Sequence, residues 1–547
     1  MSEPLQLPLQ RFNHWLQQQP DAVWLRQPVA GVWHDFTWRQ VDEQARRLAS
    51  ALLALGCAPG ERVALLAKNC AEWFISDLAI QLAGLVSVPL YPLQAPEQIA
   101  YVLEHADCKV ILVGKLDEPD KLATGIAPHI TRIAMPYPSM PTAHDWHSLL
   151  ARHQPLAGTR DQQADELLSI LYTSGTTGAP KGVMLSAGAM ARSAAWATSE
   201  LGVGAGDQFF SYLPLSHAAE RFLVQFNSLY SGAPVAFVES LETFASDLRH
   251  VRPTVFFSVP RLWTRFQQGV LEKLPQARLD RLLGIPLLGW LVARKIRAGL
   301  GLDRARVLIS GAAAISTGLL AWYQRIGLTI CEGYGMTEHF AYGCFNRPGQ
   351  VRLGSVGRPM PNLELRIAED GEILLRSQTL MQGYYRDPEK TAETLRDGWL
   401  HTGDKGAVDG DGYLRITGRV KDIFKTSKGK YVAPAPIEGE IAKCPWVEQV
   451  CLMGSNLDQP LALIELSPAA RQQAQALVSA ELLAHLAALN SHLEPHERVS
   501  HFVLVREPWT VDNGCMTPTM KIRRNVLEAR YAGLVEQLPA DQPLLWE

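Results

Sequence analysis

Residues 170–186 read ILYTSGTTGAPKGVMLS, and this stretch decides both the fold and the chemistry that we expect. An apolar run leads into a loop of hydroxyl side chains and glycines, which Pro180-Lys181-Gly182 closes. Such a loop leaves backbone N–H groups uncovered, and these groups with a nearby lysine suit a polyphosphate. The usual P-loop spacing is absent, because Gly182 follows the lysine. The predicted phosphate-binding residues are Thr173, Ser174, Gly175, Thr176, Thr177, Gly178 and Lys181.

A flexible hairpin or linker is the alternative for this loop. The apolar strand before it and the fixed Pro-Lys-Gly after it favour the phosphate interpretation, since a phosphate loop requires a strand-then-loop context.

Length and composition exclude several classes of protein. The 547 residues are enough for two to four domains. The net charge of −3 argues against a nucleic-acid partner, which would require a basic surplus. Eight cysteines without a C-x-x-C pair indicate neither a zinc site nor a disulfide framework, so we expect a cytoplasmic location. The N-terminus lacks a signal-peptide pattern, and the apolar run 282–293 is shorter than the about 20 residues that cross a bilayer.

Alternating helix and strand patterns predict an α/β fold. In the first 165 residues, strand patterns at 61–69, 86–93 and 109–114 alternate with helix patterns at 41–55, 72–84 and 96–108. Further strand patterns occupy 207–217, 234–240, 253–260 and 306–312, with a helix-rich insertion over 261–305. This order predicts doubly wound sheets with helices on both faces. Ligands bind such sheets beyond the carboxyl ends of the strands.

The pattern changes after residue 363. Short strands and Gly/Asp turns over 363–418 predict a β-rich subdomain, and the basic, glycine-punctuated segment 418–431 predicts an exposed hinge and loop. We therefore predict a large N-terminal domain over residues 1–418 and a small, mobile α+β domain over 419–547.

Residues 331–340, CEGYGMTEHF, form a second candidate nucleotide motif. Tyr334 can offer an aromatic face to a purine, while Thr337 and Glu338 can bind phosphate and Mg²⁺, which accepts one carboxylate beside phosphate oxygens. Alone, the motif is also typical of a turn with an exposed glutamate. The predicted cofactor-binding set extends to Glu332, Gly333, Gly335, Gly311 and Ala312.

Two further motifs follow. In WLHTGDKG (399–406), Asp404 can accept hydrogen bonds from both hydroxyls of a ribose, although a β-turn aspartate is the commoner role. In DNGCMTPTMKIRRN (512–525), Lys521 lies in a basic run of the kind that usually forms a solvated face.

In this order, the four motifs resemble the signatures of the adenylate-forming superfamily, which includes acyl-CoA synthetases, luciferases and peptide-synthetase adenylation domains. The resemblance covers essentially the whole chain. It implies that Tyr334 stacks on adenine, that Thr176 and Glu338 hold the magnesium ion, and that Arg419 joins Asp404 at the ribose. It also implies that Lys521 bridges the carboxylate and the α-phosphate during adenylation. Cys515 departs from the family pattern, in which hydrophobic or acidic residues are common.

The segments LPLSHAAERF (213–222) and GRVKDIFKTSKGKYVAPAPIE (418–438) are similar to the long-chain acyl-CoA synthetases within this superfamily. The similarity implies that His217 gates the carboxylate site, that Trp263 guards an acyl tunnel and that Lys421 is the pivot between domains. A structural histidine and a packing tryptophan are the alternatives. The loop expected to meet coenzyme A carries Lys425, Lys428, Gly429, Lys430 and Tyr431.

The predicted function is a ligase that uses ATP, Mg²⁺ and coenzyme A to convert a long-chain fatty acid first to acyl-AMP and then to acyl-CoA. The open alternatives are transfer of the adenylate to a carrier protein, a medium-chain or aryl acid as substrate, and a non-catalytic binding protein. Peripheral contact with the inner membrane through 282–297 is a hypothesis, with core packing as its alternative. Monomer and homodimer both stay open.

Overall fold

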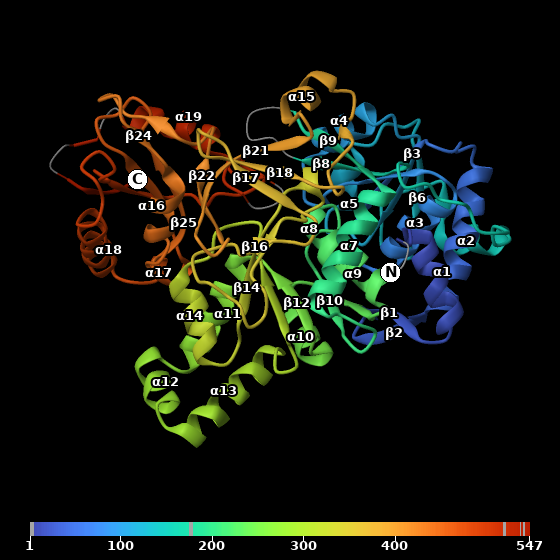
Figure 1. Ribbon diagram of the computed structural model, residues 1–547, viewed down its shortest axis with the longest axis horizontal. Helices are drawn as coiled ribbons and strands as arrows, with labels where there is room; N and C mark the ends of the chain where they lie inside the picture. The colour runs from blue at the N-terminus through green and yellow to red at the C-terminus, as the bar shows by residue number, and fades with distance from the viewer. Residues whose placement is uncertain (1–4, 174–178, 518–520, 536–537, 540–541) are drawn as a thin grey trace.

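The computed structural model describes residues 5–173, 179–517, 521–535, 538–539 and 542–547. The chain forms a large body from its N-terminal and central parts, beside which α16–α19 and their sheet form a smaller one (Figure 1). In the described part of the chain these helices are α16 (Pro434–Ile441), α17 (Pro468–Arg471), α18 (Gln475–Asn490) and α19 (Arg524–Val535).

The first large sheet, in the described ranges, contains eight strands. Strands β3, β4, β5, β6 and β7 are parallel, while β8 and β9 form an antiparallel hairpin that β19 extends. Their order across the sheet is β19 (Gly383–Tyr384), β9 (Lys181–Ser186), β8 (Leu167–Thr173), β4 (Val86–Pro89), β3 (Arg62–Ala67), β5 (Val110–Gly114), β6 (Thr131–Ala134) and β7 (His144–Asp145).

The second large sheet has nine strands among the described residues. Its central strands are parallel, so their carboxyl ends lie at one edge. Their order is β16 (Arg358–Pro359), β15 (Cys344–Phe345), β14 (Ile330–Tyr334), β13 (Val307–Ser310), β12 (Val255–Ser258), β10 (Phe209–Ser211), β11 (Val235–Phe237), β1 (Val23–Val29) and β2 (Val32–Thr37).

Helices join and cover these sheets. Every residue of helix α3 is buried, including the polar residues Glu72, Ser76, Asp77 and Gln81, so the helix is enclosed by protein on all sides. Thr37 caps α2 by accepting a hydrogen bond from the backbone N–H of Gln40. The helices are α1 (Pro8–Gln18), α2 (Trp38–Ala54), α3 (Ala71–Leu82), α4 (Pro96–His105), α5 (Pro119–Ala123), α6 (Trp146–Arg152), α7 (Ala187–Leu201), α8 (Ala218–Glu220), the π-helix η1 (Arg221–Phe226), α9 (Asn227–Ser231) and α10 (Phe244–Val251).

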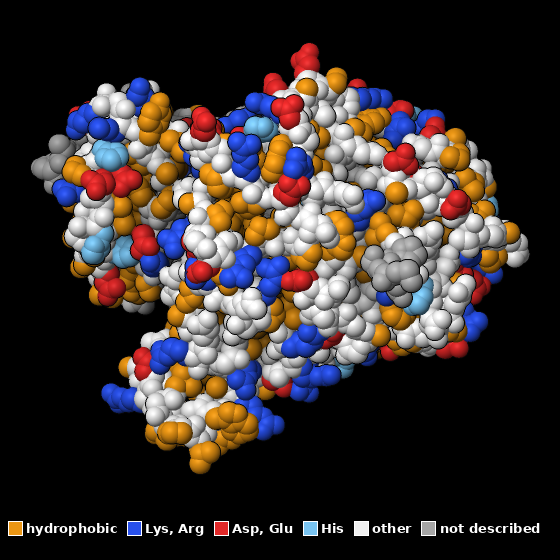
Figure 2. Space-filling view, in the orientation of Figure 1, with side chains coloured by type: hydrophobic (Ala, Val, Ile, Leu, Met, Phe, Trp, Pro, Cys, Tyr) orange, Lys and Arg blue, Asp and Glu red, His pale blue; other side chains and the backbone are white. Residues whose placement is uncertain are grey.

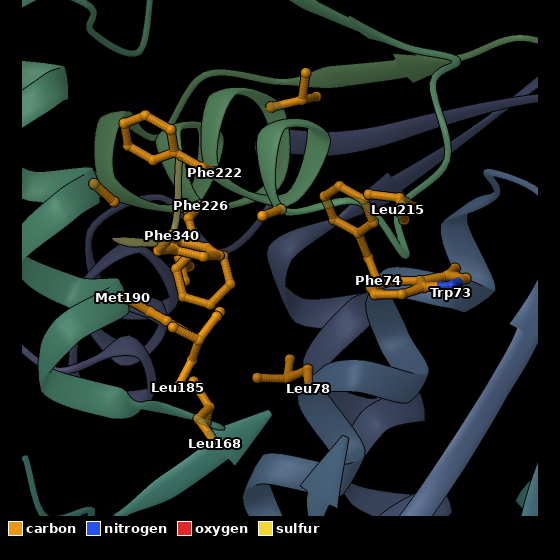
Figure 3. Packing of buried hydrophobic residues seen from close by; sticks show 14 of the residues in the cluster. Trp73, Phe74, Leu78, Leu168, Leu185, Met190, Leu215, Phe222, Phe226 and Phe340 are labelled. Atoms are coloured by element: carbon orange, nitrogen blue, oxygen red, sulfur yellow. The ribbon is translucent and has the colours of Figure 1, made fainter. Parts of the chain in front are cut away.

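The main core contains aromatic side chains from distant segments. Phe222 and Phe226 of η1 lie against Phe340, with ring centroids 5.8 and 5.4 Å from it (Figure 3). Met190 of α7 approaches the same group, while Phe74 of α3 lies near Leu215 (Figure 3). This packing fixes the segment that follows β14, where the second nucleotide motif lies.

The predicted insertion is helical. Helices α11 (Pro260–Lys273), α12 (Gln276–Leu283) and α13 (Pro286–Leu300) connect β12 to β13, and α14 (Thr317–Arg325) connects β13 to β14. In Figure 1, α12 and α13 extend away from the rest of the large body.

Within the predicted β-rich region, five described strands form one sheet: β17 (Glu364–Ile367), β18 (Glu372–Arg376), β20 (Leu395–Arg396), β21 (Trp399–Val408) and β22 (Leu414–Arg419), with α15 (Pro388–Thr394) before β20. The C-terminal part has the small hairpin β23 (Phe424–Lys425) and β24 (Tyr431–Val432). Its sheet, in the described ranges, consists of β25 (Val447–Met453), β26 (Leu461–Leu466), β27 (Phe502–Val505) and β28 (Leu544–Trp546).

The predicted α/β class is confirmed, and two details differ from the expectation. The apolar run 207–217 forms only a three-residue strand, because its prolyl and polar end leaves the sheet. The loop of the opening motif joins antiparallel strands, so it is a hairpin loop as well as a candidate phosphate loop. The domain boundary at 418/419 stays a prediction.

Candidate active site

The hairpin β8–β9 holds the two ends of the candidate phosphate loop. Thr173 and Lys181 face each other across the hairpin, while Ser174, Gly175, Thr176, Thr177 and Gly178 lie outside the described residues. Lys181 is half-buried, and its Nζ lies 5.5 Å from the centroid of the Tyr384 ring. Burial and the neighbouring cations Lys390 and Lys421 lower the pKa of the Lys181 ammonium. A cation in this position suits an anionic ligand, which would relieve that repulsion.

Glu338 lies beside this lysine. It belongs to the short 3-10 helix η2 (Thr337–His339), and its Oε1 accepts a 2.7 Å hydrogen bond from the Tyr384 hydroxyl. Tyr384 reaches both groups because β19 pairs with β9, with Tyr384 opposite Val183. Sequence analysis missed Tyr384, whose only signal is the run Gly383-Tyr384-Tyr385.

The backbone after η2 is held in an unusual conformation. Phe340 and Ala341 have φ values of +46° and +56°, a region that side chains other than glycine rarely enter. The Phe340 ring is fully buried between Phe222 and Phe226, so core packing holds the turn that presents Glu338. Gly335 approaches the same turn closely, since a Cβ there would lie 2.4 Å from the Ala341 carbonyl oxygen.

Tyr334, Asp404 and Arg419 form a connected group. The Tyr334 hydroxyl donates a 2.7 Å hydrogen bond to Asp404 Oδ2, and Arg419 Nε lies 3.1 Å from Asp404 Oδ1. Asp404 and Arg419 are direct partners in the register of β21 and β22. The structure therefore brings together the residues that were predicted to bind adenine and ribose, although Tyr334 and Arg419 are 85 positions apart in the sequence.

Lys521 of the C-terminal part reaches this group. Its side chain keeps an exposed surface, yet surrounding protein atoms and Arg419 lower the pKa of its ammonium, while Asp404 and Glu338 oppose that shift. The local turn is fixed by hydrogen bonds in both directions between Thr517 and Lys521.

His217 lies within electrostatic range of the same lysine. Burial and the Lys521 charge lower the pKa of the His217 imidazole to about 3, so the ring is neutral at physiological pH. Its Nδ1 accepts a hydrogen bond from the Ala219 backbone N–H and begins α8, which leaves Nε2 as the atom that can serve a ligand. A neutral imidazole next to a cationic lysine suits a carboxylate, since neither group adds negative charge.

The predicted strand-end residues lie together at the edge of the nine-stranded sheet. Gly311 follows β13, and a Cβ there would lie 3.2 Å from the Gly333 carbonyl oxygen of β14. Ala312 has a φ of +68°. Burial raises the pKa of the Glu332 carboxyl to about 8, and its Oε2 has no hydrogen-bond partner among the described residues.

Two further predicted residues lie outside the group formed by Tyr334, Asp404 and Arg419. Trp263 on α11 is fully buried among Phe256, Phe266 and Tyr323, which is a packing environment. Lys421 is exposed to solvent. It lies close enough to Lys181 for its positive charge to lower the pKa of the Lys181 ammonium.

The hairpin β23–β24 presents the predicted coenzyme A loop. Lys425, Lys428, Gly429, Lys430 and Tyr431 are exposed, and Gly429 has the positive φ of +78° that its turn requires. The Lys425 carbonyl accepts a hydrogen bond from the Asn456 N–H, and the Ser427 N–H donates to the Leu457 carbonyl, so the hairpin is fixed to the C-terminal part.

The residues at Glu338 fit a magnesium ion that arrives with a polyphosphate. No group of three or more His, Cys, Asp or Glu side chains suitable for a metal exists in the described part of the chain. A single buried carboxylate near the cationic Lys181 matches the preference of Mg²⁺ for one or two carboxylates with phosphate oxygens.

Two protein families match this chain. Residues 12–385 match the family of AMP-binding enzymes, and residues 421–542 match the C-terminal domain of AMP-binding enzymes.

Individual relatives match over nearly the full chain. The chain is 31% identical to the long-chain-fatty-acid–CoA ligase FadD15 of Mycobacterium bovis, over 95% of this chain and 94% of the relative. It is 30% identical to the peroxisomal long chain acyl-CoA synthetase 7 of Arabidopsis thaliana, over 93% and 83% of the two chains. Among solved structures, the anthranilate CoA ligase AuaEII with anthranoyl-AMP is similar, with a TM-score of 0.81, 25% identity and coverage of 98% and 99%.

Proposed function

Because this chain belongs to the AMP-binding enzyme family, we propose that it is an ATP-dependent ligase that activates a long-chain fatty acid and transfers it to coenzyme A. The observation that carries the proposal is the position of Lys521 within electrostatic range of Arg419, Asp404, Glu338 and His217. Lys521 comes from the C-terminal part and lies between the residues proposed to bind the nucleotide and the residue proposed to bind the carboxylate. Catalysis requires a lysine in this position, whereas binding alone does not.

In the first step, an oxygen of the fatty carboxylate attacks the α-phosphorus of ATP, and pyrophosphate leaves. Lys521 is the cation that stabilises negative charge between the carboxylate and the α-phosphate, and Lys181 stabilises the departing phosphates. Magnesium held at Glu338 would neutralise phosphate charge. His217 contributes a neutral imidazole that positions the carboxylate without repelling it.

Asp404 and Arg419 hold the ribose, and Tyr334 lies against the adenine. The hydrogen bond from Tyr334 to Asp404 sets the two residues before the nucleotide arrives, which reduces the entropy lost on binding.

In the second step, the thiol sulfur of coenzyme A attacks the carbonyl carbon of the acyl-adenylate, its proton is lost, and AMP leaves. The exposed hairpin 425–431 carries Lys425, Lys428 and Lys430, whose charges suit the phosphates of coenzyme A. We propose that the C-terminal domain turns about Lys421 between the two steps, so that Lys521 leaves and the hairpin enters. The names of the relatives support a long-chain acid as substrate.

The test incubates the purified protein with Mg·ATP and saturated acids of increasing length, with and without coenzyme A, and follows acyl-AMP and acyl-CoA by mass spectrometry. We expect acyl-CoA mainly from long chains. Acyl-AMP that accumulates in the presence of coenzyme A contradicts the proposed acceptor, and product from aryl acids alone contradicts the proposed substrate.

Lys521→Ala is the matched variant. We expect adenylate formation to fall by about 10²–10³, the usual cost of losing one transition-state charge contact. Thioester formation from supplied acyl-AMP should stay within a few-fold of wild type, because Lys521 leaves before that step. Equal loss in both half-reactions would mean that the substitution damages the fold.

A further inference from the structure

The helical hairpin formed by α12 and α13 carries a cluster of exposed apolar side chains at its end. In the space-filling view, hydrophobic side chains cover this end, with Lys and Arg on both sides (Figure 2). Leu287 is 82% exposed, and the other members are about half exposed: Ile285 51%, Leu288 39%, Trp290 55% and Leu291 53%. The alternative of core packing for this run does not hold for these five side chains.

The sequence of α13 directs these side chains away from the protein. Leu287, Trp290, Leu291 and Arg294 share one helix face, because they are spaced by three, four and seven residues. The small residues Gly289 and Ala293 are buried instead. A Cβ at position 289 would lie 2.7 Å from the Leu283 carbonyl oxygen, so the close packing of α12 on α13 depends on this glycine.

Basic residues surround the apolar end. Residues 276–300 contain Arg278, Arg281, Arg294, Lys295 and Arg297 against one acid, Asp280, which gives a net charge of +4 in a chain whose net charge is −3. Asp280 forms an ion pair with Arg325 at 2.8 Å, so its charge is partly neutralised. Arg278, Arg281, Arg294 and Lys295 are exposed, and the Arg294 guanidinium lies 5.5 Å from the centroid of the Trp290 ring.

We propose that this hairpin docks the protein on the surface of an anionic lipid bilayer. Its apolar end would enter the boundary between headgroups and acyl chains, its tryptophan would lie at headgroup level, and its basic residues would contact lipid phosphates. The apolar side chains at the end of the hairpin would reach the acyl chains. The basic residues further along the same helix face would then lie at the level of the lipid phosphates. An acidic protein surface would pair with the basic residues, but it would offer no apolar environment for the exposed leucines.

The hairpin lies on the surface of the bilayer without crossing it. Helix α13 has 15 residues, about 22 Å, which is less than the about 30 Å hydrocarbon core. No helix in the described residues is long and apolar enough to cross a membrane. This docking is independent of the ligase activity proposed above.

The test measures the partition coefficient of the full chain on vesicles of phosphatidylcholine, with and without phosphatidylglycerol, by co-sedimentation. We expect binding to the anionic vesicles that weakens at high salt. The triple variant Leu287→Ser/Trp290→Ala/Leu291→Ser should lose at least tenfold on both vesicle types, since apolar burial does not depend on lipid charge. The double variant Arg294→Gln/Lys295→Gln should bind anionic vesicles roughly 25-fold more weakly, because each charge contributes about fivefold, and its binding to neutral vesicles should be unchanged.

Matched controls come from exposed residues elsewhere. Leu241→Ser changes a leucine that is 80% exposed, and Arg415→Gln removes an exposed charge on β22, and neither should alter partition. Thermal midpoints within about 2–3 °C of wild type exclude misfolding as the cause of a changed partition coefficient.

The proposal is overturned if the protein does not bind vesicles, or if the hairpin variants bind them as well as wild type does. A dimer in light scattering that the triple variant dissociates, without vesicle binding, would identify a second copy of this chain as the occupant.

Discussion

The hydroxyl of Tyr334 donates a 2.7 Å hydrogen bond to Asp404, which joins the end of β14 in the nine-stranded sheet to β21 in the β-rich region. The same carboxylate meets Arg419 from the neighbouring strand at 3.1 Å. Asp404 is therefore held from two sides by residues that sequence analysis assigned separately to base and ribose.

This arrangement predicts separable effects on nucleotide binding. Tyr334→Phe keeps the aromatic face and removes one neutral-to-charged hydrogen bond, so the KM for ATP should rise by about five- to tenfold, or about 1–1.5 kcal/mol. Asp404→Ala also removes the proposed ribose acceptor and should raise the KM for ATP by a further tenfold, roughly. ATP-pyrophosphate exchange measures both, and the KM for the fatty acid should change less than twofold. A Tyr334→Phe enzyme with the wild-type KM for ATP would show that the hydrogen bond does not preorganise the site.

The hairpin 425–431 is predicted to act only in the second half-reaction. Lys428→Gln/Lys430→Gln removes two exposed charges and should raise the KM for coenzyme A by about three- to tenfold, with a smaller dependence on salt, because exposed charge contacts are screened. Pyrophosphate exchange without coenzyme A should be unchanged. Lys443→Gln is the control, since Lys443 is a similarly exposed lysine of the C-terminal part that lies outside the hairpin. Equal loss of adenylation in the double variant would contradict the division of labour between Lys521 and this hairpin.

Sequence patterns predicted the parts of this molecule that local residues decide. The strand before the phosphate loop, the helix that Thr37 caps and the helix-rich insertion all formed close to the predicted residues. Each depends on apolar spacing and capping within one segment, which is visible in a single sequence.

Contacts between distant segments could not be predicted in this way. Tyr384 contacts Glu338 only because β19 pairs with β9, some 200 positions earlier, and strand pairing at that distance leaves no local pattern. The exposure of Leu287 is a similar case, since a buried helix and a surface-docking helix share the same apolar run.

A buried carboxyl three positions after His217 predicts a pH-dependent stability. Glu220 is fully buried, its Oε1 accepts hydrogen bonds from Ser211 and the Tyr212 backbone N–H, and burial raises the pKa of its carboxyl to about 8. The folded state therefore holds a proton that the unfolded state releases near pH 4.5, so stability falls as the pH rises from about 4.5 to 8 and then levels off.

Glu220→Gln should remove this dependence, because glutamine keeps the acceptor oxygen and cannot ionise. The free energy of unfolding of the variant, relative to that of wild type, should increase by up to about 1.4 kcal/mol for each pH unit between 5 and 8. Urea unfolding at pH 5, 6, 7 and 8 measures the difference. Parallel curves for the two proteins would show that Glu220 is ionised in the folded state.

A buried ion pair lies beside β8, the strand that precedes the candidate phosphate loop. Arg221 of η1 contacts both oxygens of Asp77 at 2.8 Å, with both side chains fully buried. The same guanidinium donates to Ser169 of β8, the strand that enters the loop, at 2.8 Å. Helix α3, the π-helix η1 and β8 are therefore linked through one buried charge.

Removing one partner of this pair should cost more than removing both. Arg221→Met leaves the Asp77 carboxylate buried without its cation and should lower the free energy of unfolding by about 3–5 kcal/mol, while Asp77→Leu/Arg221→Met should recover much of that loss. Urea midpoints for the single and double variants give the coupling. Arg376→Met is the control, because its pair with Glu364 is 44% and 60% exposed and should contribute less than about 1 kcal/mol. A double variant no more stable than Arg221→Met would mean that the hydrogen bond to Ser169, rather than the unpaired carboxylate, dominates the loss.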